Sequence, residues 1–86
     1  MDYIFSKHAL EQMLMRNIPK SVVETVLSNP GEIIIQEKKN IYQSIVTFQG
    51  EGNYLIRVFV NTVKRPNIVI TVYKTSKISK YYEGEI

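Results

Sequence analysis

The chain has 86 residues, a formal net charge of +3 and no cysteine, and 44% of its residues are hydrophobic. This length predicts one domain over residues 1–86, and the lack of cysteine excludes disulfides and thiolate metal sites. No apolar run approaches the roughly 18 residues of a membrane helix, and no signal peptide opens the chain, so we expect a cytoplasmic protein.

The first third of the sequence predicts two helices. Ser6 is a favourable N-cap for the first helix. Four apolar residues at helical spacing give that helix a buried face: Ala9, Leu10, Met13 and Leu14. Pro19 suits the first turn of a second helix, and Asn29-Pro30-Gly31 ends it. Its predicted buried residues are Val22, Val23, Val26 and Leu27.

The remaining sequence predicts strands. Four segments are rich in Ile, Val, Thr and aromatic residues: Glu32–Gln36, Ile41–Phe48, Tyr54–Val63 and Ile68–Tyr73. Short polar stretches between them are typical of hairpin turns. We therefore expect an α+β domain in which two N-terminal helices pack on one face of a roughly four-stranded antiparallel sheet.

Alternation in the last two strands predicts which side chains share a face. The residues expected to face the core are Tyr54, Ile56, Val58, Val60, Ile68, Ile70 and Val72. Arg57, Thr71 and Tyr73 then lie on the opposite face as cross-strand neighbours. Leu55, Phe59 and Val69 are expected on that face too. The assignment assumes a regular hairpin, because one β-bulge would reverse it.

Positive charge is concentrated near the C-terminus. Residues 53–82 contain six Lys and Arg residues and no Asp or Glu, and five Phe and Tyr side chains are interleaved with them. Cations combined with stacking rings are typical of surfaces that bind single-stranded nucleic acid. An acidic protein partner and a plain solvated face are the alternatives. We expect the RNA contacts to come from Lys64, Arg65, Lys74, Lys77, Lys80 and Tyr81.

No motif for a metal or a cofactor is present, and we expect the protein to use neither. The remaining candidate chemistry is metal-free RNA cleavage, which needs proton transfer and a cation on the phosphate. His8 is the only imidazole, a group that exchanges protons near neutral pH. Arg57 could grip the phosphate in a bidentate manner, and Tyr73 could donate a proton or stack on a base. His8 as a solvated first-turn residue is the alternative interpretation.

Three segments carry a family resemblance. The segment "SKHALEQMLMRNIPKSVVETVLSNP", from Ser6 to Pro30, resembles the opening of the family catalogued as domain of unknown function 4258. The segments "YLIRVFV" and "IVITVYKTSKISKYY" resemble its last two strands, including the Thr-x-Tyr pair. A departure occurs at Gln12, where the family often has arginine.

That family is similar to small RelE-like and BrnT-like toxins, within the wider group of barnase, EndoU and colicin-type RNases. The resemblance implies a compact RelE-like α+β fold, metal-free endoribonuclease activity and a cognate antitoxin protein as partner. It assigns catalytic roles to His8, Arg16, Arg57, Thr71 and Tyr73. The alternatives that stay open are a non-catalytic RNA-binding module and a domain that docks an acidic protein.

Overall fold

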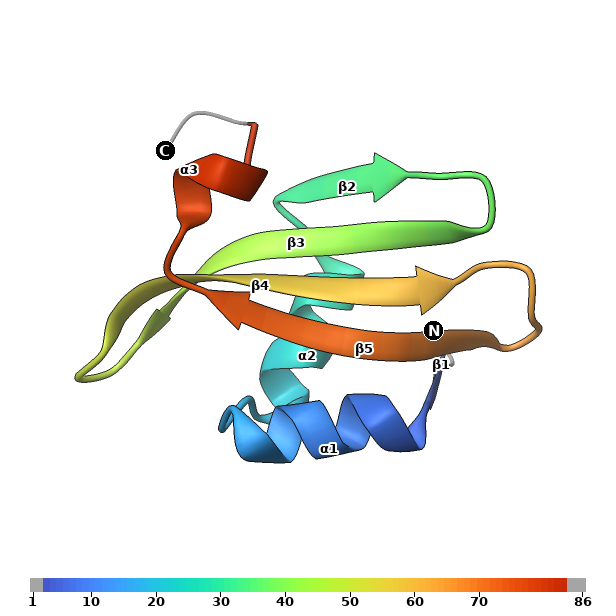
Figure 1. Ribbon diagram of the computed structural model, residues 1–86, viewed down its shortest axis with the longest axis horizontal. Coiled ribbons are helices and arrows are strands. Elements are labelled where there is room, and N and C mark those ends of the chain that lie inside the picture. Colours follow the sequence, from blue (N-terminus) through green and yellow to red (C-terminus); the bar gives the residue numbers. More distant parts are fainter. Residues whose placement is uncertain (1–2, 84–86) are drawn as a thin grey trace.

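The computed structural model describes residues 3–83 as one five-stranded sheet with three short helices. The elements are β1 (Tyr3–Phe5), α1 (Lys7–Met15), α2 (Lys20–Ser28), β2 (Glu32–Ile35), β3 (Lys39–Phe48), β4 (Gly52–Asn61), β5 (Asn67–Thr75) and α3 (Ile78–Tyr81). The strand order is β1-β5-β4-β3-β2; β1 runs parallel to β5, and the other neighbours are antiparallel. Figure 1 shows α2 behind the strands and α1 alongside β5. No helix within residues 3–83 is long and apolar enough to cross a membrane.

Helix α1 has well-defined signals at both ends. The extended Ser6 backbone precedes it, and the Ser6 hydroxyl accepts a hydrogen bond from the Ala9 amide at 3.0 Å. After the helix, Asn17 adopts a left-handed backbone with φ of 54°, which asparagine tolerates better than most residues. The Ile18 amide then donates to the Met13 carbonyl at 2.8 Å, which is the pairing of a Schellman C-cap.

The hydrophobic core lies between the two N-terminal helices and one face of the sheet, which we call the helical face. Its buried residues come from α1, α2, β4 and β5 and from the turn between the helices: Ala9, Met13, Ile18, Val23, Val26, Leu27, Ile56, Val58, Val60, Val69 and Val72. The predicted apolar face of α1 was partly wrong, because Leu10 is 48% exposed and Leu14 80% exposed. Both lie one residue beyond the Ala9–Met13 stripe, and this rotates them about 100° away from the sheet.

A β-bulge in β5 changes the predicted register. Phe59 pairs with Thr71 but Val60 pairs with Val69, so Ile70 is the extra residue. Val69 therefore faces the core and Ile70 is 37% exposed, the reverse of the prediction. The bulge lies before Thr71, so the prediction that Arg57, Thr71 and Tyr73 share a face is confirmed. Ser6 holds the bulge, since its amide donates to the Val69 carbonyl and its hydroxyl to the Ile70 carbonyl.

The opposite side of the sheet, which we call the second face, is also partly covered. Ile41, Gln43 and Leu55 are buried there, with 0–4% of their surface exposed. They belong to the alternate set of strand positions, which point away from the helical face. Helix α3 covers part of this face, because the Tyr81 ring lies over Arg57.

The predicted architecture, two N-terminal helices on a four-stranded antiparallel sheet, is wrong, although the α+β class is confirmed. The sheet has a fifth strand, β1, and is mixed because β1 runs parallel to β5. A strand of three residues is too short to show a period of two, so the pattern could not reveal it. Helix α3 is a single turn of four residues, which is likewise too short for a helical period.

Replacing Ser6 with alanine removes both the α1 cap and the bond to the bulge. We expect Ser6→Ala to lower the free energy of unfolding by about 1–2 kcal/mol, measured by urea denaturation. Ser28→Ala is the matched control, because its hydroxyl makes only an exposed 3.3 Å bond to Thr25 within the same helix. The control should change stability by less than about 0.5 kcal/mol. Equal losses in the two variants would contradict this role of Ser6.

Candidate functional site

Arg57 lies at the centre of a row of side chains on the second face. Its position on β4 is directly opposite Gln43 on β3 and Tyr73 on β5. Residues directly opposite each other in a sheet project to the same side, so strand pairing alone gathers these three. Thr71 follows on the same face, two pairs further along, opposite Phe59. We call Gln43, Arg57, Phe59, Tyr73, Lys80 and Tyr81 the Arg57 cluster.

The Arg57 guanidinium is stacked between aromatic rings. Its Cζ atom lies 4.4 Å from the centre of the Tyr81 ring and 5.3 Å from that of Phe59. Its Nε donates to the Gln43 Oε1 at 2.9 Å, and its terminal nitrogens make no hydrogen bond within residues 3–83. A guanidinium held in this way keeps a planar edge for a carboxylate or a phosphate.

Gln43 is the buried anchor of the cluster. Its side chain is fully buried, and its Nε2 donates to the Tyr81 carbonyl at 3.1 Å and to the Glu32 carboxylate. One amide therefore connects α3, β2 and Arg57. Gln43 was not among the residues predicted for a functional site. A signal existed, since a lone glutamine stands between Ile41 and Ile45, which are apolar residues at the same strand phase.

Tyr81 is surrounded by groups that favour its ionised form. Its ring meets that of Tyr73 edge-on, with centroids 6.1 Å apart, and the Lys80 Nζ lies 5.3 Å from its centre. The pKa of the Tyr81 phenol is lowered, first by a hydrogen bond from Tyr73 and also by the charges of Lys80 and Arg57, while desolvation opposes the shift. The cluster thus combines a fixed cation with a tyrosine that ionises more readily than usual.

The structure does not bring His8 or Arg16 to this cluster. Both belong to the α1 segment, which packs on the helical face, whereas Arg57 projects from the second face. The sheet therefore separates the imidazole from the guanidinium. Both side chains are exposed to solvent. The predicted set thus divides into two groups, with Arg57, Thr71 and Tyr73 together on one side.

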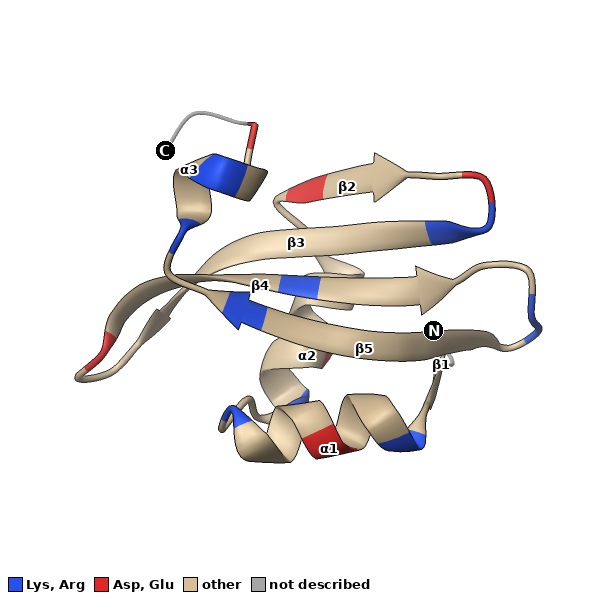
Figure 2. Cartoon of the chain, viewed as in Figure 1, with Lys and Arg blue, Asp and Glu red and all other residues tan. Residues whose placement is uncertain are grey.

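The basic residues of the C-terminal half are also divided, as Figure 2 shows. Lys80 and Tyr81 join the Arg57 cluster, and Lys77 precedes the same helix. Lys64 and Arg65 lie in the β4–β5 loop, at the end of the sheet far from α3. They do not extend the surface around Arg57.

Lys74 projects to the helical face, opposite Ile56. It forms an ion pair with Glu51 at 3.2 Å and lies over the rings of Phe48 and Tyr54, at 4.0 and 4.6 Å. The charge of Lys74 is therefore paired with other groups of the fold, on the face away from Arg57. A lysine that was not predicted, Lys39, lies over Phe59 on the second face, with its Nζ 5.9 Å from the ring centre. Among residues 3–83, no group of three or more His, Asp and Glu side chains could hold a metal ion.

The Tyr73–Tyr81 contact predicts a measurable shift. Tyr73→Phe should raise the pKa of Tyr81 toward its ordinary 10.0, because the main group that favours the phenolate is removed. NMR of tyrosine labelled at the ring ζ carbon would follow the titration, with Tyr81→Phe to assign the signal. Because the folded state lowers this pKa, stability relative to Tyr81→Phe should rise as the pH passes upward through it. Tyr54→Phe, on the helical face, should leave the Tyr81 titration unchanged.

Gln43 gives a second prediction. Gln43→Leu keeps most of the buried volume but removes the hydrogen bonds that the amide makes with Arg57, Glu32 and the Tyr81 carbonyl. We expect the free energy of unfolding to fall by about 1–3 kcal/mol in a chemical denaturation series. Gln36→Leu is the control, because that side chain is exposed and should change stability by about 0.5 kcal/mol or less. A Gln43→Leu protein as stable as the wild type would show that the buried amide does not hold this face together.

Comparison with known proteins places the chain in a family. No curated protein and no solved structure matches it significantly. The model of the family described as Domain of unknown function (DUF4258) matches residues 5–74. That range includes Arg57, Thr71 and Tyr73 and ends before α3. The chain therefore belongs to the DUF4258 family, as its helix and strand motifs predicted.

Proposed function

We propose that this protein is a metal-independent endoribonuclease that binds single-stranded RNA at the Arg57 cluster. The observation that carries the proposal is the pairing of Arg57 with Tyr81. The terminal nitrogens of the guanidinium make no hydrogen bond within residues 3–83, and its Cζ atom lies 4.4 Å from the centre of the Tyr81 ring, whose phenol has a lowered pKa. Metal-free phosphodiester cleavage needs at least a cation that stabilises charge on the phosphate and a nearby group that transfers a proton, and these two side chains can supply both.

The proposed reaction is an internal attack by the RNA itself. The ribose 2′-oxygen bonds to the neighbouring phosphorus and loses its proton to the Tyr81 phenolate. The bond from phosphorus to the 5′-oxygen breaks, and that oxygen takes a proton from Tyr73. Arg57 binds the phosphate oxygens as negative charge grows on them. The products are a 2′,3′-cyclic phosphate and a free 5′-hydroxyl.

The surroundings of the cluster suit a single-stranded substrate. Tyr73 is 37% exposed and can stack on an unpaired base. Lys80, Lys77 and Lys39 supply charge for the flanking phosphates, and Thr71 adds a hydroxyl on the same face. Lys64, Arg65 and Lys74 are not part of this proposed path.

The resemblance of the family to RelE-like and BrnT-like toxins supports a role as the toxin of a toxin–antitoxin pair. In that role the protein would slow growth by cutting RNA, and an antitoxin protein would neutralise it. The proposal differs from the family pattern in its acid–base group. His8 lies on the other side of the sheet, so tyrosines take the role that an imidazole would have.

A non-catalytic RNA-binding module is the second candidate. The observation that favours it is the separation of His8 from Arg57, because the only imidazole of the chain is then outside the cluster. Stacking rings and cations suffice for binding without cleavage. Both candidates use the same surface, so they differ only in whether the RNA is cut.

Cleavage of a fluorescent single-stranded RNA in the presence of EDTA separates the candidates. We expect wild-type protein to release a 2′,3′-cyclic phosphate product, and Arg57→Lys to slow cleavage by roughly 100-fold. Tyr81→Phe should slow it to a similar degree. Arg65→Lys, which makes the same change in the distant loop, and His8→Ala should both leave the rate unchanged.

Each other outcome has a definite meaning. RNA that stays intact but is retarded in a gel by wild-type protein, and not by Arg57→Lys, supports the binding module. A loss of cleavage in His8→Ala as large as that in Arg57→Lys would place the reaction elsewhere. If wild-type protein neither cleaves nor binds the RNA, both candidates are contradicted. The remaining interpretation of the basic face is then that it docks an acidic protein partner.

A further inference from the structure

The edge of β3 is left half unpaired by its neighbour. Strand β2 pairs with residues Asn40–Gln43 of β3, whereas β3 continues to Phe48. Continuing the same register would place Pro30 opposite Ile45, and proline has no amide hydrogen to donate. The chain just before Pro30 is the end of α2, so β2 cannot extend in that direction along β3. The edge of β3 from Ser44 to Phe48 therefore has no strand beside it within residues 3–83.

The direction of the backbone groups along this edge follows from the hairpin. The Gln36 amide donates to the Lys39 carbonyl, so Lys39 directs its backbone groups toward β2. In an antiparallel pair this direction alternates, so residues 41, 43, 45 and 47 face the same side. Ile45 and Thr47 lie beyond the end of β2. Their amides and carbonyls thus point outward in the plane of the sheet, on the side of β2, and have no strand partner in the described chain.

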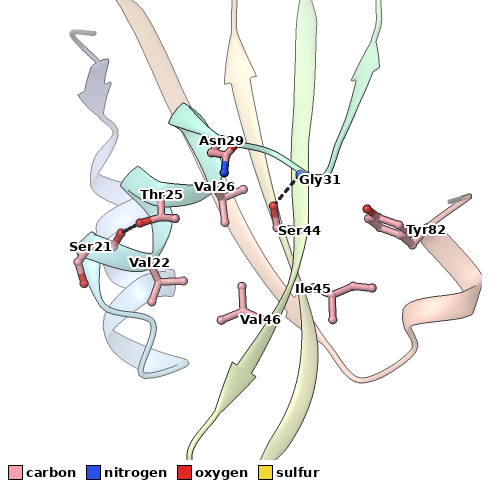
Figure 3. A pocket seen from close by; sticks show the side chains of 10 residues that line it. All are labelled: Ser21, Val22, Thr25, Val26, Asn29, Gly31, Ser44, Ile45, Val46 and Tyr82. Carbon is pink, nitrogen blue, oxygen red and sulfur yellow. Dashed lines mark hydrogen bonds between the residues drawn. The ribbon is translucent and has the colours of Figure 1, made fainter. Parts of the chain in front are cut away.

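A pocket of about 500 Å³ opens along this same edge. Figure 3 shows Val46 pointing toward the side of α2, where Val22 and Val26 lie, and Ile45 pointing the other way, toward Tyr82. The lining therefore has two sides, one on each face of the sheet. Its ten residues include Ser21, Thr25, Asn29 and Ser44 but no charged side chain.

Gly31 leaves room for Tyr82 on one side of the pocket. A Cβ atom on Gly31 would come within 2.6 Å of the Tyr82 hydroxyl. The Gly31 amide also donates to the Ser44 hydroxyl at 2.9 Å, which fixes the chain where β2 begins. Glycine here allows the end of β2 and the C-terminal segment to approach each other closely.

We propose that this edge binds an extended segment of a partner protein, which adds to the sheet as a strand beside Ser44–Phe48. The backbone groups of Ile45 and Thr47 would pair with those of the segment. Side chains of a strand alternate between faces, which matches a pocket with one side toward α2 and one toward Tyr82. The uncharged lining fits a segment of small apolar and hydroxyl side chains. This surface is separate from the Arg57 cluster, so the inference does not depend on the proposed function.

A second copy of this chain fits the edge less well. Two β3 edges could pair only through Ile45 and Thr47 of each copy, because β2 begins opposite Gln43 and the hairpin turn follows Phe48. Such a contact would be much smaller than the roughly 1,000 Å² expected of a stable interface. A linear segment has no hairpin or β2 of its own to obstruct it.

The test uses the full chain and a synthetic probe. The probe is an acetylated, amidated peptide of alternating threonine and valine, and its control is the same sequence with every amide N-methylated. We expect the probe at roughly 1 mM to shift the amide NMR signals of Ile45 and Thr47 and to slow their hydrogen exchange by roughly tenfold. The N-methylated peptide should do neither, because it has the side chains but no donors.

Two variants at one position sharpen the test. Thr47→Pro removes the outward amide hydrogen, which proline allows because that group is not part of the β3–β4 ladder. Thr47→Ala loses the same hydroxyl contact with Asn53 but keeps the amide. Binding should be lost in Thr47→Pro and kept in Thr47→Ala. Should Thr47→Pro fail to fold, the exchange rates of wild-type protein with and without the probe decide the question.

Several results would overturn the proposal. These are no change at Ile45 and Thr47, equal effects from the N-methylated peptide, equal binding by Thr47→Pro and Thr47→Ala, or shifts confined to the exposed α1 residues Leu10 and Leu14. Concentration-dependent dimerisation that protects the same amides without the probe would identify a second copy as the occupant and would contradict a partner segment at this edge. RNA cleavage or binding plays no part in this readout, so the two proposals can fail independently.

Discussion

The buried amide of Gln43 is the contact on which the second face depends. A glutamine with no exposed surface is stable only where its polar atoms are paired, and here each has a partner. Those partners come from β2, β4 and α3, so one side chain fixes Arg57 and the C-terminal helix together. The short α3 has no side-chain cap of its own. The hydrogen bond from Gln43 to the Tyr81 carbonyl and the contact of the Tyr81 ring with Arg57 both tie this helix to the sheet.

The sheet acts as a partition between two different environments. On the helical face, α1 and α2 supply a core of aliphatic residues. On the second face, the polar side chain of Gln43 is buried and bonds to Arg57, whose guanidinium is stacked between aromatic rings. Because strand side chains alternate, neighbours in sequence such as Ile56 and Arg57 belong to different environments. The same alternation separates Tyr73 from Lys74 and explains why a continuous basic block in the sequence is not a continuous basic surface.

Pro30 and Gly31, which come just before β2, shape the edge of the sheet formed by β2 and β3. Pro30 stops the ladder after four pairs, and Gly31 lets Tyr82 approach the strand. The result is a strand edge whose outer half has neighbours on both faces but, among residues 3–83, no strand beside it in the plane of the sheet. Unpaired edges of this kind are usually covered or blocked in soluble proteins. The pocket at Ile45 and Val46 therefore makes this edge a natural place for another chain to bind.

Local patterns in the sequence determined most of the fold. The Ser6 cap, the stop at Asn29–Gly31 and the period-two strands were sufficient to predict both N-terminal helices, four strands and the α+β class. They also placed Arg57, Thr71 and Tyr73 on one face, because pairing of two adjacent strands is a short-range property. The motifs along these elements were sufficient to identify the family.

Tertiary structure decided the rest, since it depends on contacts between distant residues. Strand β1 forms only because β5 is beside it, and the Ile70 bulge depends on Ser6, 64 positions earlier. Whether His8 meets Arg57 is set by the side of the sheet on which α1 packs, and a helix pattern carries no information about that side. The burial of Gln43 against Tyr81, 38 positions away, likewise follows from chain topology and not from any local signal.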